Sequence, residues 1–184
     1  MKKAIITLFL TGIISVNLLS QGIPAGDNAL LDNLVKSRFS IKKELISSDT
    51  LKKVITGNLY LVKAEYADQN STGALFENRF VIKDGKLLEP EDLSTDKKLE
   101  VLFSVVKKEF TIKTETDAKI FEKVIDAFYP LGWSNEKYRQ HLKKDGKWYF
   151  VRGEFFDNKE AVIVTLDATQ RITDISFSLE AIKK

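Results

Sequence analysis

One stretch of the chain combines a helix-start signal, a regular apolar stripe and a stop signal. Residues 114–117 read Thr-Glu-Thr-Asp, which resembles a capping box in which Asp replaces Glu. Apolar side chains then recur every three or four positions, and Pro130 and Gly132 end the pattern. The stripe consists of Ile120, Phe121, Val124, Ile125 and Phe128. This pattern predicts an amphipathic helix that packs the stripe against a core.

Helical spacing also follows Asp27, which can cap a helix. The apolar stripe there runs from Leu30 to Phe39, and the pattern can be extended toward Ile46. Ser48 or Asp49 then restarts a short helical turn, which Gly57 closes. The sequence therefore predicts one longer and one short helix before the first strand.

A third amphipathic pattern begins at Ser94 or Thr95. Leu99, Leu102 and Val106 match helical spacing, with lysines between them facing out. A buried strand through residues 101–103 is the alternative, because further apolar residues widen the stripe.

Alternation of apolar and polar residues predicts two strands in the first half of the chain. One runs from Leu59 to Ala67, and the other lies near residues 78–83. Asp84-Gly85 is a tight-turn signal, after which residues 86–88 can return along the second strand.

The last fifty residues predict a three-stranded meander. Its strands are expected at 147–156, 161–166 and 172–179, and Asp145-Gly146 opens it. The first two strands contain continuous apolar runs, which indicate cover on both faces. The last strand alternates, which indicates one face in water.

These elements predict an α+β fold. We expect a mainly antiparallel sheet of five or more strands, including the C-terminal three-stranded meander, with helices packed on one face. Residues 28–184 then form a single domain, and two helix-plus-hairpin halves, about 28–92 and 93–184, are the alternative. Lys-Asp-Gly-Lys occurs twice, at residues 83–86 and 144–147. We interpret both as lysine-flanked hairpin turns.

The first twenty residues have the pattern of a secretory signal peptide. Lys2 and Lys3 precede an apolar run, and Ser20 offers a small residue near its end. Residues 1–20 are therefore expected to be removed and residues 21–27 to form a flexible leader. No second apolar stretch reaches membrane length, and no cysteine offers a lipid anchor. The expected location is the periplasm or the outside of a bacterial cell.

Charge argues against a nucleic-acid partner. Loss of Lys2 and Lys3 lowers the formal charge from +3 to +1, and acids and bases are mixed throughout the chain. The chain has no cysteine, so no disulfide can stabilise it.

Candidate catalytic chemistry is sparse, and we predict no catalytic residue, metal site or cofactor. His141 is the only histidine, and no spacing around it suits zinc. We interpret it as a surface residue. Glu154 lies two residues from Arg152 on an apolar strand, so both face the same way. A structural ion pair is the favoured interpretation.

Aromatic residues are unevenly distributed. Ten of the nineteen lie between Phe121 and Phe156, more than one helix and one strand can easily cover. An exposed patch would bind a ligand, whereas a thick core is the alternative. The candidate ligand-binding residues are Trp133, Tyr138, Trp148, Tyr149, Arg152 and Glu154.

The sequence therefore favours an exported, soluble, non-enzymatic module that binds a protein, peptide or glycan. The alternative is a small exported hydrolase with Asp/Glu acid–base chemistry, using Glu154 or His141. A structural component of the cell envelope is a third possibility. An enzyme needs a cleft with a carboxylate of shifted pKa, whereas a binding module needs an exposed apolar surface.

Overall fold

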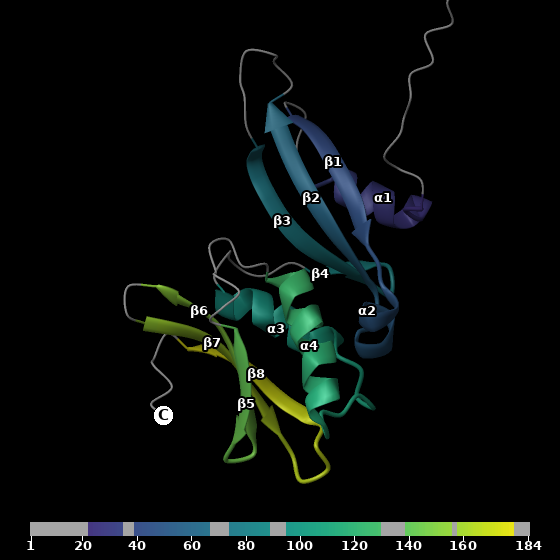
Figure 1. Cartoon of the computed structure of the whole chain (residues 1–184). Coiled ribbons are helices and arrows are strands. Elements are labelled where there is room, and N and C mark those ends of the chain that lie inside the picture. The colour runs from purple at the N-terminus through teal and green to yellow at the C-terminus, as the bar shows by residue number, and fades with distance from the viewer. Residues whose placement is uncertain are drawn as a thin grey trace, which may run out of the picture.

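Eight strands form two antiparallel sheets of four in the described part of the chain (Figure 1). The computed structural model describes residues 22–34, 39–66, 74–88, 95–129, 139–155 and 158–178. The fold is α+β, with four helices among these residues.

The first sheet has the strand order β1-β2-β3-β4. These strands are β1 (Phe39–Ile46), β2 (Asn58–Tyr66), β3 (Ala74–Lys83) and β4 (Lys86–Leu88). One face carries helix α1 (Ala25–Asp32), whose Leu31 is fully buried in a small apolar cluster with the sheet. Asp27 of α1 accepts hydrogen bonds from the Tyr60 hydroxyl and from Asn58 Nδ2. The helix is therefore held to the sheet by both apolar and polar contacts.

The second sheet has the strand order β5-β6-β7-β8. These strands are β5 (Gln140–Lys144), β6 (Lys147–Phe155), β7 (Asn158–Leu166) and β8 (Ile172–Ser178). Each strand pairs with the next in sequence, so the sheet is a simple meander.

Helices α3 (Thr95–Val105) and α4 (Glu115–Phe128) lie between the two sheets (Figure 1). Helix α2 (Asp49–Val54) lies beside α4, at the end of the first sheet. The apolar side chains of these three helices share one buried cluster with Leu59 and Val81 of the first sheet and Phe150 of the second. Phe121 of α4 is fully buried, with its ring centroid 6.0 Å from that of Phe150. Burial of this apolar surface is the main force that joins the sheets.

The architecture corrects the prediction of one sheet with five or more strands. Two sheets of four strands are present, and the C-terminal meander gains β5 as a fourth strand. The helix predicted to extend beyond Leu30 ends at Asp32, and Phe39–Ile46 is strand β1 instead. Pairing with β2 determines the conformation of residues 39–46, because partners distant in sequence stabilise the strand over the helix.

Several local predictions are confirmed. Thr114 and Asp117 form the reciprocal capping box at the start of α4, and residues 101–103 are helical. Asp84-Gly85 and Asp145-Gly146 connect β3 to β4 and β5 to β6, and all four residues have positive φ angles. This conformation is the one a type I′ hairpin turn requires.

Gly57 cannot be replaced without strain. Its φ angle is +84°, and a Cβ atom there would lie 2.6 Å from the Ile82 carbonyl oxygen. This close approach lets α2 turn directly into β2.

None of the helices that the structure describes is long and apolar enough to cross a lipid bilayer.

Candidate functional site

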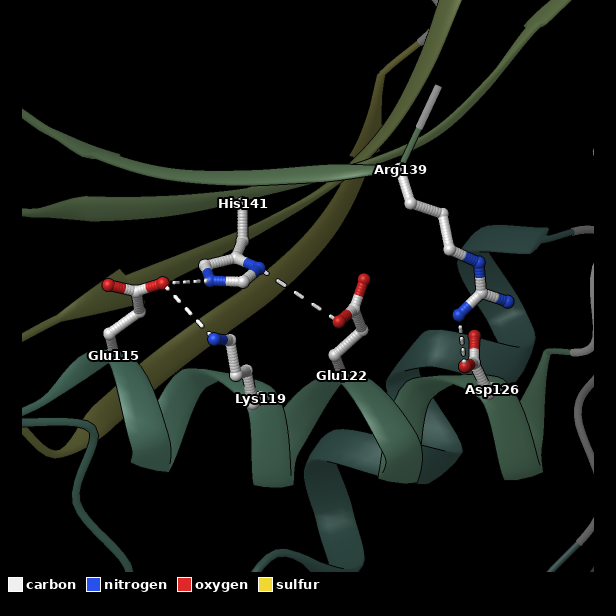
Figure 2. A network of polar contacts seen from close by, with 6 residues as sticks. All are labelled: Glu115, Lys119, Glu122, Asp126, Arg139 and His141. Carbon is white, nitrogen blue, oxygen red and sulfur yellow. Dashed lines mark hydrogen bonds and ion pairs between the residues drawn. The ribbon is translucent and has the colours of Figure 1, made fainter. Parts of the chain in front are cut away.

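A network of polar contacts joins α4 to the second sheet (Figure 2). Four charged side chains stand three or four residues apart on α4 and so share one face of the helix. They are Glu115, Lys119, Glu122 and Asp126. Arg139, which directly precedes β5, His141 of β5 and Arg152 of β6 contact this face. We call these seven residues the α4 seam.

His141 lies between two carboxylates of the helix. Its Nε2 is 3.3 Å from Glu115 Oε1, and its Nδ1 is 3.9 Å from Glu122 Oε2. The hydrogen bond from His141, followed by that from Lys119, holds the pKa of Glu115 below its usual range. Both ring nitrogens of His141 thus face carboxylates of the helix.

Asp126 binds two guanidinium groups. Its Oδ2 accepts from Arg139 at 2.8 Å, and its Oδ1 accepts from Arg152 at 2.7 Å. The Arg152 side chain is only 3 % exposed. Burial lowers the pKa of Arg152, and the charge of Asp126 opposes that shift. A buried guanidinium with a carboxylate partner is a strong constraint on how α4 meets β6.

Tyr129 extends the seam toward β7. The Arg152 guanidinium carbon lies 5.0 Å from the centre of the Tyr129 ring, within the range of a cation–π contact. The Tyr129 hydroxyl donates to Glu160 Oε1 at 2.6 Å. Burial and this hydrogen bond to Glu160 raise the pKa of Tyr129.

The α4 seam has the properties of a structural connection. Glu115 pairs with Lys119, and Asp126 pairs with Arg139 and Arg152. Together with the contacts of His141, these pairs fix the helix to β5 and β6. Among the residues that the structure describes, no group of three or more His, Asp or Glu side chains could hold a metal ion.

The structure separates the candidate ligand-binding residues. Trp148 is 6 % exposed and belongs to the common core, and Arg152 is buried in the α4 seam. Tyr149 points to the opposite side of β6 and is partly exposed. Trp133 and Tyr138 lie outside the described residues. The backbone of Glu154 pairs with that of Lys159, but its side chain lies outside the described part.

Tyr149 has two apolar neighbours that the sequence analysis did not single out. The strand register aligns Leu142 of β5, Tyr149 of β6 and Ile163 of β7 in one row across the sheet. All three side chains are partly exposed, on the face opposite α3 and α4. We call them the Tyr149 row. The available signal was the Asp145-Gly146 turn, because a hairpin turn needs a strand on each side and so places Leu142 opposite Tyr149.

The surroundings of the Tyr149 row differ on its two sides. The neighbouring row on the side of the β5–β6 turn begins with Lys144 and Lys147. It ends with Asp174 of β8. Val151 and Ala161, in the row on the other side, are buried. The exposed apolar surface is therefore narrow and bordered on one side by positive charge.

Similarity assigns no family or function to this chain. Comparisons with protein-family models, with curated proteins and with solved structures give no significant match.

Proposed function

We propose that the chain is an exported, non-enzymatic binding module that contacts a protein, peptide or glycan through the Tyr149 row. The observation that carries this proposal is the alignment of Leu142, Tyr149 and Ile163 on the face of the second sheet away from the helices. Three adjacent, partly exposed apolar side chains on a sheet are suited to contact a partner.

Tyr149 and the lysines beside the row favour different kinds of contact. The Tyr149 ring can pack on a flat apolar surface, such as a sugar face or a side chain, while its hydroxyl stays in water. Lys144 and Lys147 add positive charge next to the row. An acidic peptide segment or an acidic glycan would satisfy both features.

The polar contacts of the α4 seam support a binding role over hydrolysis. A general acid or base needs a side chain directed toward the substrate. His141 instead faces Glu115 and Glu122, which hold it against the helix. Export is supported by the pattern of the first twenty residues, with two lysines before an apolar run.

Photo-crosslinking at the Tyr149 row tests this proposal. Benzoylphenylalanine at position 149, in cells that express the chain natively, is expected to capture one species in near-stoichiometric yield. The matched control is the same crosslinker at Ala168, an exposed turn residue of the same sheet. Capture at 149 should be lost on Ile163→Asp and absent at 168, and the captured chain should start near residue 21.

Equal capture at positions 149 and 168 would contradict binding through the Tyr149 row. A captured chain that retains Met1 in the cytosol would contradict export. A captured glycan and a captured protein are distinguished by the mass added to the chain.

A further inference from the structure

His141 faces α4 with both nitrogens of its ring (Figure 2). Nε2 lies 3.3 Å from Glu115 Oε1, and Nδ1 lies 3.9 Å from Glu122 Oε2. A neutral imidazole carries one N–H group, so its other nitrogen presents a lone pair. In the neutral ring, one of the two carboxylates therefore faces a lone pair. The protonated ring presents an N–H group to each carboxylate, and so it is the form that fits this position.

Helix α4 presents two carboxylates and one ammonium group to this part of β5. Lys119 Nζ lies 3.4 Å from Glu115 Oε1, so it shares that carboxylate with His141. The exposed charge of Lys119 is screened by water, which weakens its opposition to a second cation. The Glu122 side chain is only 20 % exposed, and charges interact more strongly where water is excluded. The two glutamates and the lysine leave one negative charge, which a protonated His141 balances.

The other cations on this side of the second sheet have partners of their own. Lys143 is on the same face of β5 and donates from Nζ to Gln170 Oε1 at 2.6 Å. Arg139 and Arg152 both donate to Asp126, at 2.8 Å and 2.7 Å. These three cations are directed at their own acceptors, whereas the imidazole nitrogens are directed at the two glutamates of α4.

Glu115 is ionised over the range in which a histidine changes its charge. The hydrogen bond from His141, followed by that from Lys119, keeps the pKa of Glu115 below its usual range. Histidine ordinarily gains its proton between about pH 8 and pH 5. Contacts that need the protonated ring are therefore present at the acidic end of this range and are lost as pH rises.

Strand β5 occupies a position where these contacts matter. It is a five-residue strand at the edge of the second sheet, and among the described strands it pairs with β6 alone. The His141 side chain is 15 % exposed, and its ring centroid lies 6.1 Å from that of Trp148. Short edge strands open locally at a lower free energy than the inner strands of a sheet. Attachment of His141 to α4 therefore adds to the stability of β5 on the sheet.

We propose that protonation of His141 is a pH-dependent lock that fastens β5 to α4. The protonated ring bridges Glu115 and Glu122, whereas the neutral ring can donate to only one of them and lets β5 open more often. Because β5 also carries Leu142, the lock changes how firmly one member of the Tyr149 row is held. The lock operates whether or not that row binds a partner.

Amide hydrogen exchange of the full chain tests the lock at about pH 5.5 and about pH 7.5, on either side of the ordinary histidine value. Division by the intrinsic exchange rate at each pH gives a protection factor for each amide. The amides of β5 are expected to be about fivefold better protected at the lower pH, as a partly exposed ion pair predicts. The ring resonances of His141, the only histidine, report its protonation. Strand β1, the edge of the first sheet, is the internal control and should be protected equally at both pH values.

Variants assign the effect to the imidazole and its carboxylates. His141→Gln has no titrating ring, so the protection of β5 should differ by less than about twofold between the two pH values. Glu122→Gln removes one end of the bridge and should lower the pH effect from fivefold to about twofold. Glu109→Gln, the same substitution at an exposed turn, is the matched control and should retain the full effect.

Equal protection of β5 at both pH values in the parent chain would overturn the lock. A full pH effect in His141→Gln or in Glu122→Gln would overturn it as well, because the lock needs the titrating ring and both carboxylates. An effect of the same size on β1 would assign the change to the whole chain and not to β5. None of these outcomes depends on the partner of the Tyr149 row.

Discussion

At the scale of single residues, Arg152 constrains how α4 packs against β6. Its guanidinium is almost fully buried, and its partner Asp126 is shared with Arg139. One nitrogen of Arg152, Nη1, is buried without a hydrogen bond. The ion pair with Asp126 therefore compensates only part of the cost of burying this charge.

Removal of the Asp126 charge should leave the buried charge of Arg152 without its carboxylate partner and so lower stability. We expect Asp126→Asn to lower the free energy of unfolding by about 3 kcal/mol, the lower end for a broken buried pair. The lower end applies because the Asp126 side chain is 29 % exposed. Urea denaturation with an unchanged m-value measures the loss.

The matched control is Glu100→Gln, which removes an exposed ion pair with Lys97. It should change stability by less than about 0.5 kcal/mol. Similar losses of stability in both variants would show that the Asp126 charge is not needed to stabilise the buried Arg152 guanidinium.

The partner of Arg152 illustrates what the sequence could not predict. Arg152 and Glu154 were expected to pair because they share one side of β6. The side chain of Glu154 lies outside the described residues, so that pair stays a prediction, but Arg152 binds Asp126, 26 residues earlier on α4. Asp126 belongs to the polar side of the helix, and only the packing of the second sheet brings β6 over that side. Such a contact is set by tertiary structure and has no local pattern.

At the scale of elements, α4 begins as its sequence predicts. Thr114 Oγ1 accepts from the Asp117 backbone N–H, and Asp117 Oδ2 accepts from the Thr114 backbone N–H at 2.8 Å. Burial acts to raise the pKa of Asp117, but hydrogen bonds from Thr114 and Lys113 outweigh it, so the pKa is lowered. Local residues determine this feature, which is why the sequence suffices.

The lowered pKa of Asp117 predicts a pH-dependent contribution to stability. A carboxylate with a lower pKa in the folded chain stabilises it above the ordinary value of 3.8. This contribution is lost as pH falls through the folded value. Asp117→Asn should therefore cost about 0.5–1 kcal/mol at pH 7, and the difference from the parent chain should shrink as pH falls below 3.8.

Urea denaturation of both chains at several pH values measures this difference. Glu109→Gln, at an exposed turn, is the control and should stay within about 0.5 kcal/mol of the parent at every pH. If Asp117→Asn lowers stability equally at every pH, its effect comes from the altered side-chain geometry and not from the lost charge.

Strands β1 and β5 show where pattern reasoning fails. Phe39–Ile46 follows a helix whose apolar spacing continues into it, and pairing with β2 overrides that spacing. Gln140–Lys144 has only one large apolar residue, Leu142, so it offers no clear alternation. The signal for β5 was the Asp145-Gly146 turn, since a hairpin turn needs a strand on each side.

At the scale of the whole molecule, the two sheets depend on the same core. Leu59 of the first sheet and Trp148 of the second belong to one buried cluster, with the helices between them. The sheet that carries the Tyr149 row is thus joined to the first sheet by one packed interior. We expect the described elements to unfold as one cooperative unit.

The most direct test uses Trp148 as the only tryptophan, in a Trp133→Phe background. Leu59→Ala in the first sheet should destabilise the chain by about 3 kcal/mol. The Trp148 fluorescence transition in urea should shift by that amount and coincide with the far-ultraviolet circular dichroism transition. Phe103→Ala, at a side chain that is 40 % exposed, should shift it far less. An unmoved Trp148 transition, with circular dichroism that becomes biphasic, would show that the two sheets fold independently.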